Sequence, residues 1–264
     1  MHTSASSREL PVALSIAGSD SGAGAGIQAD LLTFASQGVF GTTAITCLTA
    51  QNPRGVSGVQ ASPAAFVTEQ CAQVAAHFHP KALKTGMLLN AEIVVAVAGF
   101  IQASGIPAVI DPVMVASSGA TLLTPDAIAA VKTRLIPLAA LVTPNLDEAT
   151  ILLGRKSSGG VAEALELAKA YGVPFLLKGG HAEGDDLTDC LAWPTGESKT
   201  FTARRAPNVD THGSGCTLSA AIAALLAKGR PLAEAVAEAK AYLTRALKTA
   251  PSLGHGHGPL DHWA

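Results

Sequence analysis

The chain alternates between short apolar runs and longer stretches in which apolar positions recur with a helical period. Residues 11–17 form the first apolar run and predict a strand. Residues 27–37 follow, and Ile27, Leu31 and Phe34 fall on one side of a helix drawn over them. Strands that alternate with helices are typical of a mostly parallel sheet covered by helices on both faces. The pattern therefore predicts an α/β fold.

The same alternation continues to the carboxyl terminus and predicts the remaining elements. Further strands are expected at residues 39–49, 82–85, 108–110, 141–143 and 174–177, with a hairpin at residues 190–193 and 199–203. Helices are expected at residues 63–77, 90–102, 124–135, 161–171, 216–228 and 231–249. Because no linker, repeat or shift in composition divides the chain, we expect a polar tail over residues 1–10 and one domain over residues 11–264.

Composition excludes several classes of protein. Apolar residues make up 48% of the chain and charged residues 14%, so the chain collapses into a core rather than staying disordered. The 18 basic and 20 acidic residues give a net charge of -2, which provides no basic excess for a nucleic-acid partner. Mean hydropathy is +0.33, but the longest apolar stretches fall short of the ~20 residues that span a membrane. We expect no membrane association.

The cysteines and the amino terminus bear on the compartment. Cys47, Cys71, Cys190 and Cys216 are widely spaced and form no Cys-x-x-Cys pair, so neither a zinc site nor a disulfide framework is indicated. The first ten residues are polar and lack the apolar stretch of a secretory signal. We therefore expect a cytoplasmic enzyme.

A first glycine-rich turn, residues 18–26, lies between the first strand and the first helix. Such a turn exposes backbone N–H groups at a helix N-terminus, where an anion or polar ligand binds. Within it, Gly24-Ala-Gly-Ile-Gln-Ala29 matches the dinucleotide pattern G-x-G-x-x-A, which leaves a nicotinamide oxidoreductase as an alternative. That pattern also requires an acidic residue ~20 positions later, and residues 43–50 contain none. A P-loop is excluded because Gly-Lys-Ser/Thr is absent.

A second glycine-rich turn, residues 210–216, leads into an apolar helix. The amides of Gly213, Ser214 and Gly215 would form a cluster of donors that suits a phosphoryl group in transit, although an ordinary helix N-terminus has the same residues. Cys216 lies in the first helical turn, where a helix N-terminus lowers a thiol pKa and favours proton acceptance. A buried cysteine acting as a small hydrophobic residue is the other interpretation.

Four further polar residues follow strands, at the sheet edge where α/β proteins bind ligands. Asn145 and Glu148 have the spacing of a helix capping box, and they could instead hold Mg²⁺ through water. Asp111 ends one strand. Lys178 follows another, as either a solvated end or a phosphate contact.

The carboxyl-terminal histidines, His255, His257 and His262, suggest a metal site. The glycine-rich sequence around them provides no rigid element to fix ligand geometry. We therefore expect these histidines at the surface.

Seven motifs occur in a fixed order, and together they are specific. They are Ala17-Gly-Ser-Asp-Ser-Gly-Ala-Gly-Ala-Gly-Ile-Gln-Ala-Asp30, Thr49-Ala-Gln-Asn52, Lys84-Thr-Gly-Met-Leu88, Thr143-Pro-Asn-Leu-Asp-Glu148, Lys178-Gly-Gly-His181, Thr211-His-Gly-Ser-Gly-Cys-Thr-Leu-Ser-Ala220 and Gly256-His-Gly-Pro259. Over residues 11–263 the chain closely resembles the hydroxymethylpyrimidine/phosphomethylpyrimidine kinases of thiamine biosynthesis, in the ribokinase superfamily.

The resemblance implies a three-layer αβα ribokinase-like fold with a mostly parallel central sheet, and a homodimer. It implies that ATP and Mg²⁺ support phosphorylation of 4-amino-5-hydroxymethyl-2-methylpyrimidine and then of its monophosphate. One departure is the turn Gly18-Ser-Asp-Ser-Gly-Ala-Gly24, where many relatives carry Asp-Pro-Ser-Gly-Gly. Cys216 stands where sugar kinases of the superfamily use aspartate, which disfavours a sugar substrate. A pyridoxal kinase stays an alternative.

The resemblance also implies a role for each matching residue. Gln51 is expected to bind the aminopyrimidine in a pocket lined by Gly18, Asp20 and Met87. An anion hole beside the catalytic Cys216 is expected from Gly213, Ser214 and Gly215. ATP and its phosphates are expected to contact Lys178, Asn145 and Asp111, and Glu148 is expected to hold Mg²⁺ through water.

Overall fold

The computed structural model describes residues 9–115, 123–179, 186–204, 212–254 and 258–264. His181, Asp210, Thr211, His255, Gly256 and His257, which the sequence analysis singles out, lie outside these ranges.

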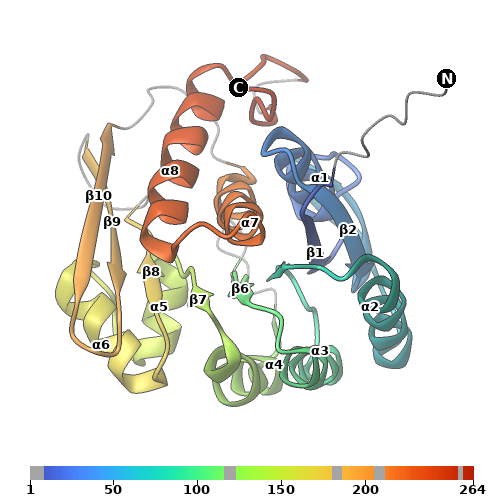
Figure 1. The fold of residues 1–264 in the computed structure, drawn as a ribbon, viewed down its shortest axis with the longest axis horizontal. Coiled ribbons are helices and arrows are strands. Elements are labelled where there is room, and N and C mark those ends of the chain that lie inside the picture. The colour runs from blue at the N-terminus through green and yellow to red at the C-terminus, as the bar shows by residue number, and fades with distance from the viewer. Residues whose placement is uncertain (1–8, 116–122, 180–185, 205–211, 255–257) are drawn as a thin grey trace, which may run out of the picture.

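The described residues contain an eight-stranded sheet in the order β10-β9-β8-β7-β6-β5-β1-β2 (Figure 1). Neighbouring strands from β2 to β8 pair in parallel, and the hairpin β9–β10 is antiparallel. The strands are β1 (Val12–Ala17), β2 (Phe40–Ile45), β5 (Ala82–Thr85), β6 (Ala108–Ile110), β7 (Leu141–Val142), β8 (Phe175–Leu177), β9 (Asp186–Ala192) and β10 (Ser198–Arg204).

Helices cover both faces of this sheet (Figure 1). One layer consists of α1 (Gly26–Ser36), α7 (Ser214–Ala227) and α8 (Leu232–Lys248). The other consists of α2 (Ala64–Phe78), α3 (Ala91–Ser104), α4 (Pro125–Ala130), α5 (Leu146–Leu153) and α6 (Val161–Tyr171). Along β1, Ala13 packs with the first layer, whereas Leu14 and Ile16 pack with the second. The three-layer αβα architecture with a mostly parallel sheet is confirmed.

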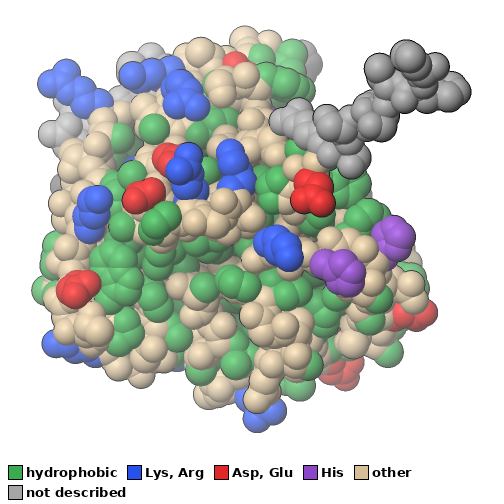
Figure 2. All heavy atoms as spheres, viewed as in Figure 1, with side chains coloured by type: hydrophobic (Ala, Val, Ile, Leu, Met, Phe, Trp, Pro, Cys, Tyr) green, Lys and Arg blue, Asp and Glu red, His purple; other side chains and the backbone are tan. Residues whose placement is uncertain are grey.

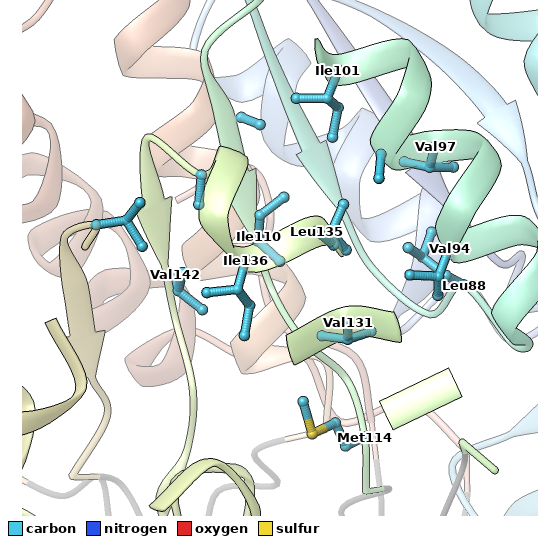
Figure 3. Packing of buried hydrophobic residues seen from close by; sticks show 14 of the residues in the cluster. Leu88, Val94, Val97, Ile101, Ile110, Met114, Val131, Leu135, Ile136 and Val142 are labelled. Carbon is cyan, nitrogen blue, oxygen red and sulfur yellow. The ribbon is translucent and has the colours of Figure 1, made fainter. Parts of the chain in front are cut away.

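The larger apolar core lies between the sheet and the second helical layer (Figure 3). Val94, Val97 and Ile101 of α3 face Ile110 of β6 there, and all four are buried. Within the described residues, no helix is long and apolar enough to cross a membrane.

The expected strand at residues 39–49 is wrong in one respect, because the chain divides it at Thr46. The Thr46 amide donates to the Ala17 carbonyl at 3.0 Å, and its hydroxyl donates to the Met87 carbonyl at 2.7 Å. The chain then leaves the large sheet as β3 (Cys47–Asn52) and pairs with β4 (Gly55–Ala61) in a separate antiparallel sheet. The sequence analysis missed β4, since all of its residues are exposed and show no buried face.

The expected helix at residues 124–135 also changes character. It is α-helical only to Ala130 and continues as the π-helical turn η1 (Val131–Leu135) and the 3₁₀ turn η2 (Ile136–Leu138). Pro137 lies at the start of this last turn, where its missing N–H group is tolerated.

A buried ion pair fixes α1 against the sheet. Lys84 of β5 and Asp30 of α1 are fully buried, and the Lys84 Nζ atom lies 2.8 and 2.9 Å from the two carboxylate oxygens. The hydroxyl of Ser15 in β1 donates to the same carboxylate at 2.5 Å. Burial acts to lower the pKa of Lys84, but Asp30, together with Cys216 and Asp111, outweighs burial and raises it. The pair therefore joins α1, β1 and β5.

We predict that Asp30→Ala destabilises the fold by ~3–5 kcal/mol, because it leaves the Lys84 ammonium buried without a counter-charge. Chemical denaturation measures this change. The double variant Asp30→Leu with Lys84→Met removes both charges, and we expect it to be more stable than Asp30→Ala. Equal stabilities of the two variants would contradict this account of the pair.

Candidate active site

A cleft of about 880 Å³ opens at the carboxyl ends of the parallel strands, beside β1, where the strand order reverses. Open α/β sheets bind ligands at this position. Each of the residues predicted for the site lines this cleft: Gly18, Asp20, Gln51, Met87, Asp111, Asn145, Glu148, Lys178, Gly213, Ser214, Gly215 and Cys216. On the face drawn in Figure 2, acidic and basic side chains are interspersed.

The two glycine-rich turns meet in the cleft. Gly213 caps α7 with a φ of 79°, and a Cβ atom there would lie 1.8 Å from the carbonyl oxygen of Gly24. The Gly26 amide, at the start of α1, donates a hydrogen bond to the thiol of Cys216, at the start of α7. Two helix N-termini therefore converge on one point, and both favour an anion.

Asp20 holds the first turn in shape. Its carboxylate accepts the amides of Gly22 at 2.8 Å and Ala25 at 2.9 Å, and it lies 3.5 Å from Nε2 of His212 in the second turn. Burial acts to raise the pKa of Asp20, but the hydrogen bonds from His212, Gly22 and Ala25 outweigh it and hold the pKa below its usual value. Asp20 thus keeps its charge and links the two turns.

The expectation that the helix N-terminus lowers the pKa of Cys216 is wrong for the cleft without ligands. Burial raises the pKa of this thiol; Lys84 opposes that effect, and Asp30 and Asp111 add to it. The thiol therefore holds its proton at neutral pH.

Lys178 lies between Asp111 and the glycine turn that is predicted to bind an anion. Its Nζ atom is 3.1 Å from Oδ1 of Asp111, and a Cβ atom on Gly215 would lie 3.3 Å from the same Nζ. Asp111 also accepts hydrogen bonds from Thr143 at 3.2 Å and Ser219 at 3.3 Å. Burial acts to lower the pKa of Lys178, but the negative charges of Asp111 and Glu148 have the larger effect and raise it. The lysine therefore stays charged.

Asn145 and Glu148 form the capping box of α5, which confirms the structural interpretation of this pair. The Glu148 amide donates to Asn145 Oδ1 at 2.8 Å, and Glu148 Oε2 accepts the Asn145 amide at 2.9 Å. Its other oxygen accepts the Met114 amide at 3.2 Å. Burial raises the pKa of Glu148 to about 7; Lys178 opposes this rise, and Asp111 adds to it.

The carboxylates of Asp111 and Glu148 fit a magnesium ion held largely through water. Among the described residues, no three His, Cys, Asp or Glu side chains group closely enough to hold a metal directly. Mg²⁺ uses few protein carboxylates and retains several waters. Asp111 and Glu148 are both buried in the same cleft, and the pKa of Glu148 is raised. A cation that binds between two such carboxylates is favoured electrostatically.

Gln51 is attached to the first turn through its backbone. Ser21 Oγ donates to the Gln51 carbonyl at 2.7 Å and accepts the Gln51 amide at 2.8 Å. The side-chain oxygen of Gln51 accepts from Thr49 Oγ1 at 3.2 Å. The hairpin β3–β4 therefore brings a carboxamide to the cleft across from Gly18 and Met87.

The sequence analysis missed several residues of the cleft. Lys240 of α8 lines it and pairs with Asp189 of β9 at 2.6 Å, but helical spacing alone gave no sign of that role. Lys84 could have been found from the sequence, because a lysine within the apolar run 82–85 is expected to be either buried and paired or functional. His212 lies next to the predicted anion hole.

Comparisons with known proteins converge on one family. The sequence model described as phosphomethylpyrimidine kinase matches residues 20–261. The hydroxymethylpyrimidine/phosphomethylpyrimidine kinase of Rhizobium meliloti is 49% identical over 96% of this chain and 97% of that protein.

Two solved structures have the same fold. The Bacillus subtilis pyridoxal kinase in complex with ADP superposes with a TM-score of 0.88 at 36% identity, over 96% of this chain and 98% of that one. The phosphomethylpyrimidine kinase of Clostridium difficile superposes with a TM-score of 0.79 at 36% identity, over 91% of this chain and 100% of that one.

We predict that Gly213→Ala destabilises the protein more than Gly229→Ala. Both glycines have a φ of 79°, but nothing lies within 4 Å of a Cβ on Gly229. Gly229→Ala therefore pays only the left-handed strain of about 1–2 kcal/mol. Gly213→Ala must also displace the Gly24 turn, which adds about 1–3 kcal/mol. Equal denaturation midpoints would show that the turns are not in tight contact.

We predict a pH dependence of stability that originates at Glu148. Burial raises its pKa from the ordinary value of 4.5 to about 7 in the folded state, so the folded state binds more protons between these pH values. The neutral carboxyl favours folding below pH 4.5, and this contribution is lost as the pH rises through 7. Relative to Glu148→Gln, the wild-type free energy of unfolding should fall by ~1–3 kcal/mol over that range. The prediction would be contradicted if the free energies of unfolding of wild type and Glu148→Gln changed in parallel with pH.

Proposed function

The chain belongs to the phosphomethylpyrimidine kinase family, and from that premise we propose that it transfers the terminal phosphoryl group of ATP to the hydroxyl of 4-amino-5-hydroxymethyl-2-methylpyrimidine. It then phosphorylates the resulting monophosphate to the diphosphate. The observation that carries the proposal is the convergence of two helix N-termini beside Lys178, at one end of a cleft large enough for a nucleotide and a small acceptor.

The acceptor end of the cleft suits a flat, neutral ring. A carboxamide offers one donor and one acceptor on the same group, which matches the amino group and ring nitrogen of an aminopyrimidine. Gln51 provides this group, and Met87, Val56 and Val59 provide apolar walls. Recognition therefore depends on hydrogen-bond pairing rather than on charge.

The other end suits a phosphoryl group in transit. The backbone amides of Gly213, Ser214 and Gly215 lie at the start of α7, and Lys178 adds a positive charge beside them. These fixed dipoles stabilise the charge on the equatorial oxygens without rearrangement. Asp111, Asn145 and Glu148 would hold the Mg²⁺ of the nucleotide through water, and that ion supplies neutralisation of phosphate charge.

Cys216 acts as the proton acceptor in the first transfer. The Cys216 thiol first releases its own proton to water; as the oxygen–phosphorus bond to the acceptor then forms and the bond to ADP breaks, the hydroxyl proton passes to the resulting thiolate. The Gly26 amide and Lys84 favour the thiolate that this step needs, although burial keeps the resting thiol protonated. The alternative role is a wall of the anion hole, in a transfer loose enough to need no early deprotonation.

Pyridoxal is the second candidate acceptor, because one solved neighbour is a pyridoxal kinase. The family resemblance also supports a cytoplasmic location and a homodimer. Leu48, Val56 and Val59 of the hairpin β3–β4 are each about half exposed, which gives a second copy an apolar surface.

An ADP-release assay tests the proposal across hydroxymethylpyrimidine, its monophosphate, pyridoxal, pyridoxine and ribose. We expect the two pyrimidines to be the best acceptors, with loss of turnover when Mg²⁺ is chelated and no requirement for a nicotinamide nucleotide. Preference for pyridoxal would replace the proposed acceptor. Turnover that is unaffected by chelation, or tight binding of NAD, would remove the kinase assignment.

We predict that Gln51→Leu raises the KM for the pyrimidine by roughly 10–100-fold, because the groups it pairs are left unsatisfied at ~1–3 kcal/mol each. Nucleotide affinity depends on the other end of the cleft and should stay unchanged. Gln60→Leu is the matched control, since Gln60 lies exposed on β4 of the same hairpin. A pyrimidine KM within twofold of wild type would place the pocket elsewhere.

We predict that Cys216→Ser lowers kcat for the hydroxymethyl acceptor by ~10²–10⁴-fold, the usual contribution of a general base. The second transfer should fall less, because a phosphate oxygen is already ionised. Cys216→Asp should recover part of the first transfer. Cys190→Ser controls for the exchange of a buried thiol outside the cleft. A Cys216→Ser enzyme that keeps more than about half its kcat would assign catalysis to the amides, Lys178 and the metal.

A further inference from the structure

The described carboxyl-terminal residues fold back against α7 and α8, with Leu260 and His262 buried and Trp263 exposed. The exposed fraction is 0% for Leu260 and 1% for His262, so the expectation of a surface position is wrong for His262. The Asp261 amide donates to the Ala246 carbonyl of α8 at 3.1 Å. The hydroxyl of Tyr242, also in α8, donates to the His262 carbonyl at 3.0 Å. Backbone hydrogen bonds thus hold this segment against α8, in addition to the contacts that its side chains make.

The imidazole of His262 makes a hydrogen bond on each side. Its ring donates to the backbone of Leu260, and its Nε2 atom lies 3.1 Å from Oγ1 of Thr217. We assign the ring proton to Nδ1, on the side of the Leu260 backbone, which leaves Nε2 as an acceptor. The Thr217 hydroxyl therefore donates to His262. Burial lowers the pKa of His262 and keeps this neutral form.

Thr217 lies directly behind the predicted anion hole. It follows Cys216 in the first turn of α7 and is fully buried, and its amide donates to the Gly213 carbonyl at 2.9 Å. A threonine hydroxyl inside a helix usually bonds to a carbonyl of the preceding turn. In α7 the hydroxyl of Thr217 is bound instead by His262, which lies 45 positions later in the chain. The terminal segment therefore fixes the rotation of the turn that carries the amides of Gly213, Ser214 and Gly215.

We propose that His262 is a positioning residue for phosphoryl transfer, which acts through Thr217 on the anion-binding turn of α7. The inference rests on the proposed function. A turn whose amides are misplaced by a fraction of an ångström still binds a nucleotide, but it stabilises the transition state less well. The carboxyl-terminal segment is in this way part of the active-site architecture although it does not line the cleft.

Three single variants and one double variant test this role in steady-state kinetics. We expect His262→Leu to lower kcat by roughly 10–100-fold and to leave the KM for ATP within about threefold. His262→Gln keeps an acceptor near the Nε2 position and should restore kcat to within about fivefold of wild type. Thr217→Val removes the donor and should match His262→Leu. The double variant His262→Leu with Thr217→Val should be no slower than either single variant, because both remove the same contact.

Two further measurements separate positioning from loss of stability and from an incorrect substrate. Val97→Ala, in α3 on the opposite face of the sheet, lowers Tm without touching α7 and should keep the wild-type kcat. Amide hydrogen exchange by mass spectrometry needs no substrate; we expect faster exchange over residues 213–217 in His262→Leu and not in Val97→Ala.

If the wild type phosphorylates neither pyrimidine, the proposed function fails and the exchange measurement still tests the role of His262. Unchanged exchange in His262→Leu overturns the inference. It is equally overturned if His262→Leu keeps the wild-type kcat for an acceptor that the wild type phosphorylates.

Discussion

The contact between two glycine turns is the constraint on which the rest of the site depends. Gly213 reaches the carbonyl of Gly24 so closely that no side chain fits between the two turns. That approach brings the start of α7 to the start of α1 and places Cys216 against the amide of Gly26. Without it, the sheet would still form, but its switch point would present one helix N-terminus instead of two.

Much of the fold was predictable because its parallel strands are buried on both faces. Such strands appear in the sequence as plain apolar runs, and β5 and β6 begin and end where those runs do. The capping box of Asn145 and Glu148 was equally readable, since its geometry is local and depends on spacing alone. The two glycine turns are recognisable from their residues as candidate anion sites, but nothing in their spacing indicates that they touch.

The features that could not be predicted depend on tertiary contacts. Strand β4 has no buried face, so no hydrophobic period marks it. Thr46 ends β2 through bonds to Ala17 and Met87, which are distant in sequence. The pKa of Cys216 is raised rather than lowered because burial and two carboxylates outweigh the helix terminus, Lys84 and the Gly26 amide. His262 was expected at the surface because glycines surround the carboxyl-terminal histidines in the sequence, and only its contact with Thr217 in the structure explains its burial.

Pairing of charges determines how the cleft attracts its ligands. Lys178 is paired with Asp111, Lys240 with Asp189, and His212 lies against Asp20. Each of these three side chains already has a carboxylate beside it, so the two helix N-termini add positive potential beyond that of these pairs. Lys178 can turn fully to a phosphate only when Asp111 gains another partner, and a hard divalent cation is the partner that carboxylates prefer. Burial raises the pKa of Glu148, and the neighbouring carboxylate of Asp111 adds to that rise, so a cation bound beside the two carboxylates would act against it. Nucleotide and metal are therefore expected to favour each other's binding, since each releases a charge that the other uses.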